Sequence, residues 1–438
     1  MTTAKDSKTA VGNYFISNYP PYSFWKPEKV AEAMEVLERP PASTETPLGV
    51  YLHIPFCRKR CRFCYYRVYT DKNAEEIQRY VQAAVRELAF YAARPLIAGR
   101  DPEFVYFGGG TPSYLSVRQL TALTEEMKRL LPWDRAKEVT FECEPGTLTE
   151  PKLKFLRRAG VTRLSLGVEH YDEEILRLNG RAHGAKEVDR AYGWARHADF
   201  PQINIDLIAG MMGDTDDKWK AAVEKAIDAQ PDSITIYQME IPYNTIIYQE
   251  MKAEGLETAP VADWDVKRAW TDFAFKRLED HGYTITSTTT AVKDPRKTRF
   301  LYRDRLWTGA DLIGLGVASF GHLGGTHYQN EHDWGPYLRR LERGEPPICR
   351  ALTPTAEERL IRELILQFKL GQIRASYFQK KFGVEIRERF APAFEVLRDG
   401  GFLLESGDEI RLTRPGLLQV DRLVLEFFLP EHRDARYA

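Results

Sequence analysis

An alternation of short β-rich runs with longer helical stretches is the sequence feature that most restricts how this chain can fold. Residues that favour strands gather at about 48–53, 103–107, 138–142, 162–166, 202–208 and 233–238. Stretches with helical character lie at about 74–94, 117–131, 150–159, 185–198, 216–229 and 263–281. Strand, helix and strand joined by right-handed crossovers produce a parallel sheet. Because six such units are two short of a closed eightfold barrel, the sequence predicts an α/β fold with an open, partial (β/α)6 barrel, whose loops after the strands carry the chemistry.

The segment before this alternation is irregular but rich in aromatic residues. Residues 13–25 combine six aromatic side chains with turn-forming residues, and a short helix is predicted at 27–37, ahead of a proline-containing linker. A disordered tail would seldom hold so many aromatic residues. We therefore expect residues 1–46 to form an N-terminal arm that packs against the main body.

The chain changes character after about residue 350. The expected elements there are an amphipathic helix, a pair of helices, a hairpin and a last helix, at 355–370, 375–399, 402–412 and 416–428. Helices with a β-ribbon are typical of a winged-helix-like module, which is often purely structural. The expected domains are therefore the arm at 1–46, the barrel with its extension at 47–345, and a mainly helical C-terminal module at 346–438.

Composition excludes several classes of protein. The 62 Lys and Arg residues balance 63 Asp and Glu residues, so the chain has no overall basic footprint for nucleic acid. No run of 18 apolar residues predicts a membrane span, and the polar residues 1–11 lack the apolar core of a secretion signal. Five cysteines are too few for a disulfide scaffold. We expect a cytoplasmic protein, in which cysteines serve as ligands before they serve as bridges.

Three of the five cysteines stand close together in Cys57-Arg-Lys-Arg-Cys61-Arg-Phe-Cys64, a C-x3-C-x2-C motif after the first predicted strand. Three thiolates can converge on one metal centre, but four are needed to saturate zinc or an ordinary iron–sulfur cluster. Cys143 and Cys349 are isolated in sequence. Two alternative interpretations are a zinc knuckle with a remote fourth ligand and an accidental spacing of the cysteines. The preferred one is a [4Fe–4S] cluster on Cys57, Cys61 and Cys64, with one iron open to a small chelating ligand.

Acidic residues interrupt three apolar strands of the predicted sheet. Glu142 and Glu169 end the third and fourth strands, and Asp206 lies within the fifth. An unpaired carboxylate in such a strand would be costly. Each is therefore either one half of a buried salt bridge, for which Arg181 is a candidate partner, or part of a ligand-binding site.

The cysteine motif resembles the signature of the radical S-adenosylmethionine (SAM) superfamily. The lead-in Tyr51-Leu-His-Ile-Pro-Phe-Cys57 is similar to that of its HemN-like branch, which contains oxygen-independent coproporphyrinogen III dehydrogenase, and the similarity extends over about residues 14–425. The resemblance implies that the open iron binds the amino and carboxylate groups of SAM. Electron transfer from the reduced cluster then yields methionine and a 5′-deoxyadenosyl radical. Some members of the branch bind a second SAM molecule.

The resemblance also implies the residues that bind SAM. The glycines after the second strand, which let backbone approach a ligand closely, match the segment that receives the methionyl group. Phe63 matches the aromatic residue that meets the adenine. Glu142 matches the residue that binds the amino group, and Glu169 replaces the usual glutamine. The implied set is Tyr51, Phe63, Gly109, Gly110, Thr111, Glu142, Glu169, Arg181, Asp206, Glu240 and Phe320, with Cys57, Cys61 and Cys64 as metal ligands.

Four reactions or roles remain open within this branch. The resemblance favours oxidative decarboxylation of coproporphyrinogen III or a related tetrapyrrole, but the dehydrogenase has a further cysteine after the motif where this chain has Tyr65 and Tyr66. The main alternative is a C-methyltransferase or cyclopropane-forming enzyme that uses a second SAM. Heme chaperones of this branch usually begin almost at the first strand, so the 46 preceding residues disfavour that role. Heme degradation is the fourth.

The loop around the cysteines is strongly basic, with Arg58, Lys59, Arg60, Arg62 and Arg67. It is either a solvated loop whose charge offsets an anionic cluster or a dock for an acidic electron carrier such as flavodoxin or ferredoxin. We expect a monomer. We also expect the N-terminal arm to lie over the mouth of the barrel, because a carbon radical has to be shielded from solvent.

Overall fold

The computed structural model describes residues 8–10, 12, 14–256, 258–433 and 435. The chain divides into two compact units, each made of segments that lie apart in sequence. The cysteine-loop unit comprises Trp25–Asp206 and Phe300–Thr353, and the C-terminal unit comprises Met1–Phe24, Leu207–Arg299 and Pro354–Ala438. This grouping follows spatial contacts, and the sequence-based domain limits at residues 46 and 345 stay a prediction.

A parallel sheet forms the centre of the cysteine-loop unit. Its first four strands lie side by side in chain order, and β9 joins the free edge of β1 in the same direction. Most of their residues are buried, as expected for strands covered on both faces. The strands are β1 (Leu48–Ile54), β2 (Phe104–Gly109), β3 (Glu138–Cys143), β4 (Arg163–Glu169), β5 (Gln202–Ala209), which follows β4 in the sheet, and β9 (Asp311–Leu315).

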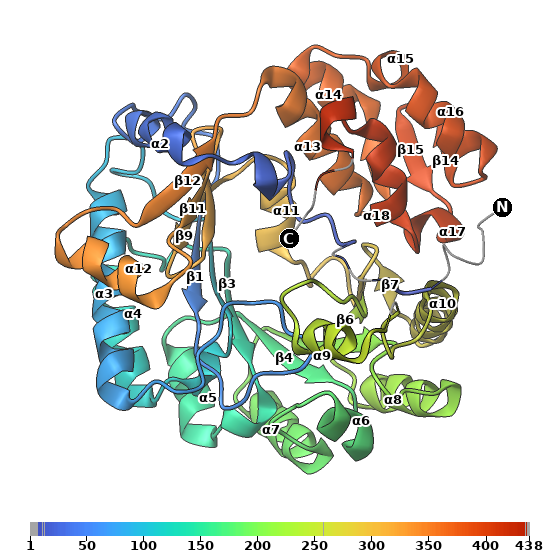
Figure 1. Cartoon of the computed structure of the whole chain (residues 1–438), viewed down its shortest axis with the longest axis horizontal. Coiled ribbons are helices and arrows are strands. Elements are labelled where there is room, and N and C mark those ends of the chain that lie inside the picture. The colour runs from blue at the N-terminus through green and yellow to red at the C-terminus, as the bar shows by residue number, and fades with distance from the viewer. Residues whose placement is uncertain (1–7, 11, 13, 257, 434, 436–438) are drawn as a thin grey trace. The chain divides into compact units, whose positions relative to one another are not determined.

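Helices connect these strands and flank the sheet (Figure 1). Local capping signals fix where two of them begin, because Asn73 and Ser116 each form a capping box with the residue three positions on. The helices confirm the predicted ranges to within a few residues, and α6 is an additional short helix. They are α3 (Ala74–Ala92), α4 (Val117–Leu130), α5 (Glu150–Arg158), α6 (Glu173–Leu178) and α7 (Ala185–His197).

An antiparallel extension, which the sequence analysis did not resolve into elements, continues the sheet beyond β9. The connection between β10 and β11 is the pair Gly324 and Gly325, both with positive φ, which is the backbone that a tight two-residue hairpin requires. The order is β9, β10, β11, β12. The elements are β10 (Phe320–Leu323), β11 (Thr326–Asn330), β12 (Ile348–Leu352), α2 (Val30–Leu37), α11 (Leu301–Leu306) and α12 (Trp334–Glu342).

The C-terminal unit holds the sixth predicted strand and the helices on either side of it in the sequence. In this unit β6 pairs with β8, and β8 with β7, in antiparallel fashion. The elements are β6 (Ser233–Gln238), β7 (Thr284–Ile285), β8 (Thr290–Val292), α8 (Asp216–Asp228), α9 (Ile246–Glu254) and α10 (Trp264–Asp280). Among the described residues, no helix is both long and apolar enough to cross a membrane.

The C-terminal module is mainly helical, as predicted, and its hairpin gains a third strand, β13. The two helices predicted at 375–399 are three, because the short α15 lies between α14 and α16. The last predicted helix at 416–428 is wrong, because it is broken into three short pieces. Tertiary hydrogen bonds from Thr288 and Gln238 occupy the carbonyls of Leu417 and Leu418, which a continuous helix would use itself. The elements are α13 (Ala356–Phe368), β13 (Gln372–Arg374), α14 (Ala375–Phe382), α15 (Ile386–Arg389), α16 (Ala391–Asp399), β14 (Leu403–Ser406), β15 (Glu409–Leu412), α17 (Arg414–Leu417), α18 (Val420–Leu423) and a 3-10 turn at Val424–Phe427.

The described part of the arm that belongs to this unit packs against the C-terminal module. Tyr19 is fully buried, with its ring edge-on to Phe428 at 4.8 Å. The Ile16 amide donates to Asp421, and Asn18 accepts a hydrogen bond from Arg362. The expected packing of the arm is therefore found here, and its predicted place over the barrel mouth stays a prediction.

Candidate cofactor site

The cysteine motif lies on the loop that leaves β1. Cys57, Cys61 and Cys64 are all half-buried free thiols. Burial raises the pKa of the Cys57 thiol to about 11 and that of Cys64 to about 12, and in both cases the neighbouring Cys61 adds to the rise. The three sulfurs therefore lie close enough to influence one another. A metal centre would have to displace their protons, because ligating cysteines are thiolates.

Each of the three sulfurs has a hydrogen-bond donor, which for Cys64 is the Tyr66 backbone amide. The Thr111 hydroxyl donates to Cys57 Sγ at 3.3 Å, and Arg181 Nη1 donates to Cys61 Sγ at 3.4 Å. Hydrogen bonds and a nearby positive charge favour the thiolate. Arg181 Nη2 donates to the Gly167 carbonyl at 2.5 Å, while its buried Nε has no acceptor in the part of the chain that the structure describes. The guanidinium thus has hydrogen-bonding capacity left for a ligand.

The glycine run after β2 lets this loop lie directly against the cysteine loop. A Cβ at Gly110 would come within 2.9 Å of the Ile54 carbonyl and 3.1 Å of Cys57 Sγ. Gly109 has φ +112°, and a Cβ there would lie 2.4 Å from the His53 ring. Larger residues would therefore push the two loops apart. The close approach that the sequence analysis assigned to these glycines is present, although toward the cysteine loop itself.

Glu142 is held at the end of β3 by two donors. The Tyr106 hydroxyl donates to one carboxylate oxygen at 2.5 Å, and the Gly109 amide to the other at 3.1 Å. Burial nevertheless raises the pKa of Glu142 to about 7, and the negative charge of Asp206 contributes to the rise. The carboxylate is thus poised between its neutral and ionised forms near neutral pH.

Glu169 and Asp206 complete a group of carboxylates whose charges interact with Glu142. Glu169 has φ +66°, an unusual backbone for a residue with a side chain, which costs on the order of 1–3 kcal/mol. Burial raises its pKa to about 7, with further contributions from Asp206 and Glu142, although Arg181 lies 3.6 Å away. Asp206 accepts hydrogen bonds from Ser165 at 3.0 Å and Asn204 at 2.8 Å. Three carboxylates whose nearby positive charges are those of Arg163 and Arg181 would favour a ligand that carries positive charge.

Tyr51 and His53 link β1 to the far end of the cysteine loop. His53 Nε2 lies 3.1 Å from the Arg67 carbonyl, which can only accept, so Nε2 carries the proton. Nδ1 is then the acceptor for the Tyr51 hydroxyl at 3.2 Å. Burial lowers the pKa of His53 to about 4, so the ring is neutral. The sequence analysis quoted His53 in the lead-in but did not give it this positioning role.

A buried ion-pair network that the sequence analysis missed anchors the start of the loop. Glu144 accepts hydrogen bonds from Arg58 at 3.0 Å and from His183 at 2.9 Å. Burial by itself would raise the pKa of Glu144, but the bonds from His183 and Arg58 outweigh it and hold the pKa at about 2. The sequence did offer a signal for Glu144, because it is an acidic residue directly after the third strand. Glu142, two positions earlier, was selected on the same ground.

The basic residues of the loop are largely engaged within the unit. Arg58 pairs with Glu144, and Arg67 pairs with Asp333. Arg60 donates to the Cys64 carbonyl and Arg62 to that of Leu178. These side chains therefore help to shape the loop, a role that neither of the two sequence-based interpretations included.

The remaining predicted SAM residues have other contacts. Phe63 is half-buried in the loop between Cys61 and Cys64. Phe320 begins β10 and lies edge-on to Trp25 at 5.6 Å. Glu240 belongs to the C-terminal unit and accepts a hydrogen bond from the Tyr14 amide at 3.1 Å. Of the predicted SAM residues, Gly110, Thr111 and Arg181 lie directly at cysteine sulfurs, and Tyr51 reaches the loop through His53. Gly109, Glu142, Glu169 and Asp206 belong to the adjoining group of carboxylates and their partners.

Two family models match this chain, one over the parallel strands and one over the C-terminal module. The family model of the Radical SAM superfamily matches residues 51–226, and that of the HemN C-terminal domain matches residues 355–418. The chain belongs to the radical SAM superfamily. Within it, the chain is an enzyme of the HemN-like branch, which confirms the membership predicted from the cysteine motif and its lead-in.

Individual relatives carry two different descriptions. Heme chaperone HemW of Bacillus subtilis is 27% identical over 375 residues, covering 84% of this chain and 96% of the relative. Oxygen-independent coproporphyrinogen III oxidase of Pseudomonas aeruginosa is 26% identical over 409 residues, covering 90% and 88%. The solved structure of coproporphyrinogen III oxidase (HemN) from Escherichia coli matches with a TM-score of 0.81 and 21% identity, over 96% of this chain and 99% of that one. This structural likeness confirms the predicted fold class.

The superfamily implies a [4Fe–4S] cluster and SAM, and the residues present fit both. Three free thiols, each with a hydrogen-bond donor at its sulfur, suit a cluster that has one open iron. Buried carboxylates and the unused Nε of Arg181 suit a ligand with a positive charge and a carboxylate. The individual SAM contacts remain predictions.

Proposed function

We propose that this enzyme removes carbon dioxide from the propionate side chains of coproporphyrinogen III or a related tetrapyrrole. The observation that carries the proposal is the group formed by Glu142, Glu169 and Asp206 beside the cysteine loop, which suits a cationic cofactor at a thiolate-bound cluster. The choice of reaction is supported by the oxidase relative, which spans 90% of this chain. The choice of this reaction is further supported by the aromatic N-terminal arm, whose Tyr19 is buried in the folded protein.

The cysteine loop supplies the reactive centre in this proposal. Cys57, Cys61 and Cys64 would hold the cluster, which with SAM supplies a 5′-deoxyadenosyl radical when bound. The Arg181 guanidinium at Cys61 offsets the negative charge that the thiolates bring into a half-buried site. The Thr111 hydroxyl stabilises the Cys57 thiolate through a hydrogen bond from a neutral donor.

The carboxylates would bind and orient the cofactor by charge. A cation about 4 Å from a carboxylate gains about 4 kcal/mol at the effective dielectric typical of a protein surface, before desolvation costs. Because Glu142 has a pKa of about 7, a cationic ligand would stabilise its ionised form. The Gly109 amide and the Tyr106 hydroxyl already fix the direction in which this carboxylate points.

The proposed reaction is an oxidation in which a propionate side chain that reacts becomes a vinyl group. The radical takes one hydrogen atom from the carbon β to the carboxylate, and 5′-deoxyadenosine leaves. The carboxylate then departs as carbon dioxide and one electron passes to a one-electron acceptor outside the chain. A reduced flavodoxin or ferredoxin is the proposed electron donor for SAM cleavage.

C-methylation with a second SAM is the second candidate. It is favoured by Tyr65 and Tyr66, which stand where the dehydrogenase has its further cysteine. Their rings stack at 4.6 Å, and their side chains are 36% and 46% exposed. An exposed aromatic pair offers a flat apolar surface beside the cluster loop rather than another thiol.

Anaerobic turnover separates these functions. Cluster-loaded protein is incubated with SAM, a reductant, a one-electron acceptor and coproporphyrinogen III, and the products are followed by mass spectrometry. We expect carbon dioxide loss with formation of 5′-deoxyadenosine, abolished in Cys57→Ala and retained in Cys143→Ala. Gain of CH2 with S-adenosylhomocysteine would replace the proposal by methyl transfer. Stoichiometric heme binding without 5′-deoxyadenosine would replace it by a chaperone role.

A further inference from the structure

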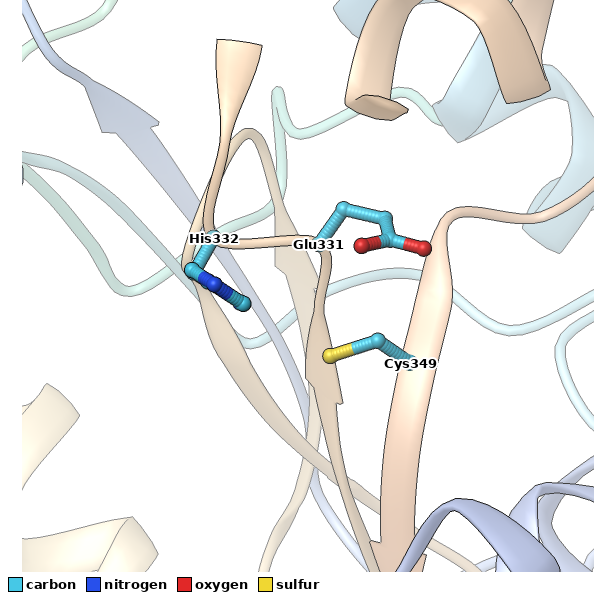
Figure 2. Close-up of side chains that lie close together, drawn as sticks. All are labelled: Glu331, His332 and Cys349. Atoms are coloured by element: carbon cyan, nitrogen blue, oxygen red, sulfur yellow. The ribbon is translucent and has the colours of Figure 1, made fainter. Parts of the chain in front are cut away.

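Three side chains with metal-binding atoms meet at the edge of the antiparallel extension, apart from the cysteine motif. Glu331 and His332 follow β11, and Cys349 lies in β12 (Figure 2). One ligand atom from each, a carboxylate oxygen, an imidazole nitrogen and the thiol sulfur, lie within 4.8 Å of one another. The sequence analysis left Cys349 as an isolated cysteine, and the radical SAM chemistry does not use it.

A β-bulge brings Cys349 to this position. Across the β11–β12 ladder Gln329 pairs with Arg350 and Asn330 pairs with Ile348, so Cys349 is the extra residue without a cross-strand pair. Such a bulge redirects the side chain of the inserted residue. The Cys349 thiol donates to the Asn330 carbonyl at 3.4 Å, which places it beside the residue that follows, Glu331.

The backbone holds Glu331 firmly in place. Its amide donates to the Pro347 carbonyl at 2.7 Å, and its carbonyl accepts from the Ala318 amide at 2.8 Å. The carboxylate is near enough to the Cys349 thiol to raise its pKa, in addition to the rise caused by burial. The pair is therefore preformed, and His332 is the adjacent, more exposed member.

We propose that Glu331, His332 and Cys349 bind a divalent cation of the zinc class, at a site distinct from the cluster. Thiolate, imidazole and carboxylate are the ligands that zinc combines in proteins. Calcium and magnesium are excluded because they require oxygen ligands throughout. Three protein ligands leave a fourth tetrahedral position for water or an added ligand.

The three ligand atoms have to move only a short distance to bind a zinc ion. Zinc bonds of about 2.0–2.3 Å in a tetrahedron set the ligand atoms about 3.3–3.8 Å apart. Atoms that lie within 4.8 Å therefore need to close by at most about 1.5 Å. The His332 side chain is 67% exposed, so its ring can turn toward the ion while the thiol stays where the bulge holds it.

The present ion pairs of Glu331 and His332 are long contacts, and the residue at the other end of each has a further hydrogen bond or ion pair. Glu331 lies 3.5 Å from Arg340, which also donates to the Ile348 carbonyl at 2.5 Å. His332 lies 3.4 Å from Asp333, which also pairs with Arg67. Arg340 and Asp333 would thus keep a partner when Glu331 and His332 turn to the cation.

The test uses cluster-loaded protein kept under anaerobic conditions. Zinc sulfate is added, unbound metal is removed, and zinc and iron per chain are measured by elemental analysis. We expect about one zinc per chain with the iron content unchanged, and X-ray absorption at the zinc edge showing one sulfur among nitrogen and oxygen ligands. His332→Ala and Cys349→Ala should each weaken zinc binding by at least about tenfold.

A control variant and the iron content distinguish this zinc site from zinc bound elsewhere in the chain. Cys143→Ala removes a buried thiol elsewhere and should retain the zinc, and the exposed His332 can be replaced without disturbing the core. Equal zinc content in wild type, His332→Ala and Cys349→Ala would contradict the site. Zinc that appears only as iron is lost, or that shows sulfur ligation alone, would place the metal at Cys57, Cys61 and Cys64 and equally refute the proposal.

Discussion

Arg181 donates a hydrogen bond to the sulfur of Cys61 across 120 residues of sequence. The contact brings a full positive charge to one of the three predicted cluster ligands. The same guanidinium holds the Gly167 carbonyl and faces Glu169 at 3.6 Å, so it connects the end of β4 to the cysteine loop. Arg181 is therefore the residue through which the cofactor site should be most sensitive to charge.

Removing that charge should make the cluster harder to reduce. In Arg181→Gln we expect the reduction potential to fall by on the order of 60 mV, which corresponds to about 1.4 kcal/mol for one electron. A redox titration followed by electron paramagnetic resonance measures the potential. Arg177→Gln, an exposed change four residues earlier, should leave it unchanged. Equal potentials in wild type and Arg181→Gln would show that the charge is neutralised by other groups.

Asp206 should contribute to SAM affinity rather than to cluster assembly. Asp206→Asn keeps an acceptor for Ser165 but removes the charge. Loss of one charged hydrogen bond typically costs about 1.5–3 kcal/mol, or about 10- to 150-fold in affinity. Isothermal titration under anaerobic conditions measures the affinity, and the visible spectrum of the cluster serves as the control. An unchanged affinity would assign Asp206 to its network with Ser165 and Asn204 alone.

SAM binding should become tighter as pH rises through about 7. Burial, together with the Asp206 charge, raises the pKa of Glu142 to about 7 against the lowering effects of the Tyr106 hydroxyl, the Gly109 amide and Arg163. A cationic ligand prefers the ionised form, so affinity between pH 6 and pH 8 should increase several-fold, up to about tenfold for one group. Titrations at several pH values measure this, and Glu142→Gln should bind weakly with a flatter profile. A wild-type profile as flat as that of the variant would exclude Glu142.

The raised pKa of Glu142 also predicts that the ligand-free protein becomes less stable as pH rises, whereas SAM binding becomes tighter. The folded-state pKa of Glu142 lies above its ordinary value of 4.5, so the folded protein binds more protons than the unfolded chain between these limits. Its contribution to the free energy of unfolding should therefore fall as pH rises from about 4.5 to about 7. Denaturant unfolding at pH 5 and pH 7.5 should show this loss in wild type and a smaller one in Glu142→Gln.

The Tyr19 hydroxyl should stabilise the attachment of the arm to the C-terminal module. It accepts from the Leu429 amide at 3.2 Å and lies 2.7 Å from His432 Nδ1. Tyr19→Phe leaves these buried groups without a partner, so the free energy of unfolding should fall by about 1–3 kcal/mol. Tyr22→Phe, at a more exposed hydroxyl beside Ser17, should change it by less than about 0.5 kcal/mol. Similar values for both variants would show that the hydroxyl contributes little.

The arm should also keep SAM cleavage coupled to product formation. Deleting residues 1–15 removes the Tyr14 amide that binds Glu240 but leaves Ile16, Asn18 and Tyr19 in place. If the arm shields the radical, the ratio of 5′-deoxyadenosine to product should rise well above that of the full chain. Deleting residues 1–7 is the matched control. A constant ratio in both truncations would limit the arm to packing.

The amino-acid sequence by itself determined the repeating strands and helices and the cysteine motif. Apolar runs marked β1 to β4, and capping residues such as Asn73 and Ser116 marked where helices begin. These signals are local, because hydrophobic periodicity and caps depend on residues within a few positions of one another. The spacing of Cys57, Cys61 and Cys64 is equally local, which is why it indicated a cluster.

Only the tertiary structure decided which distant residues meet. The carbonyls of Leu417 and Leu418 are taken by Thr288 and Gln238, so a segment with helical character is broken. Arg181 reaches Cys61 because the loops after β1 and β4 leave the parallel sheet at the same, carboxyl end of its strands. Cys349 turns toward Glu331 because of one unpaired residue in the β11–β12 ladder. Strand order, register and bulges are set by packing between segments far apart in the chain, and local sequence patterns do not encode them.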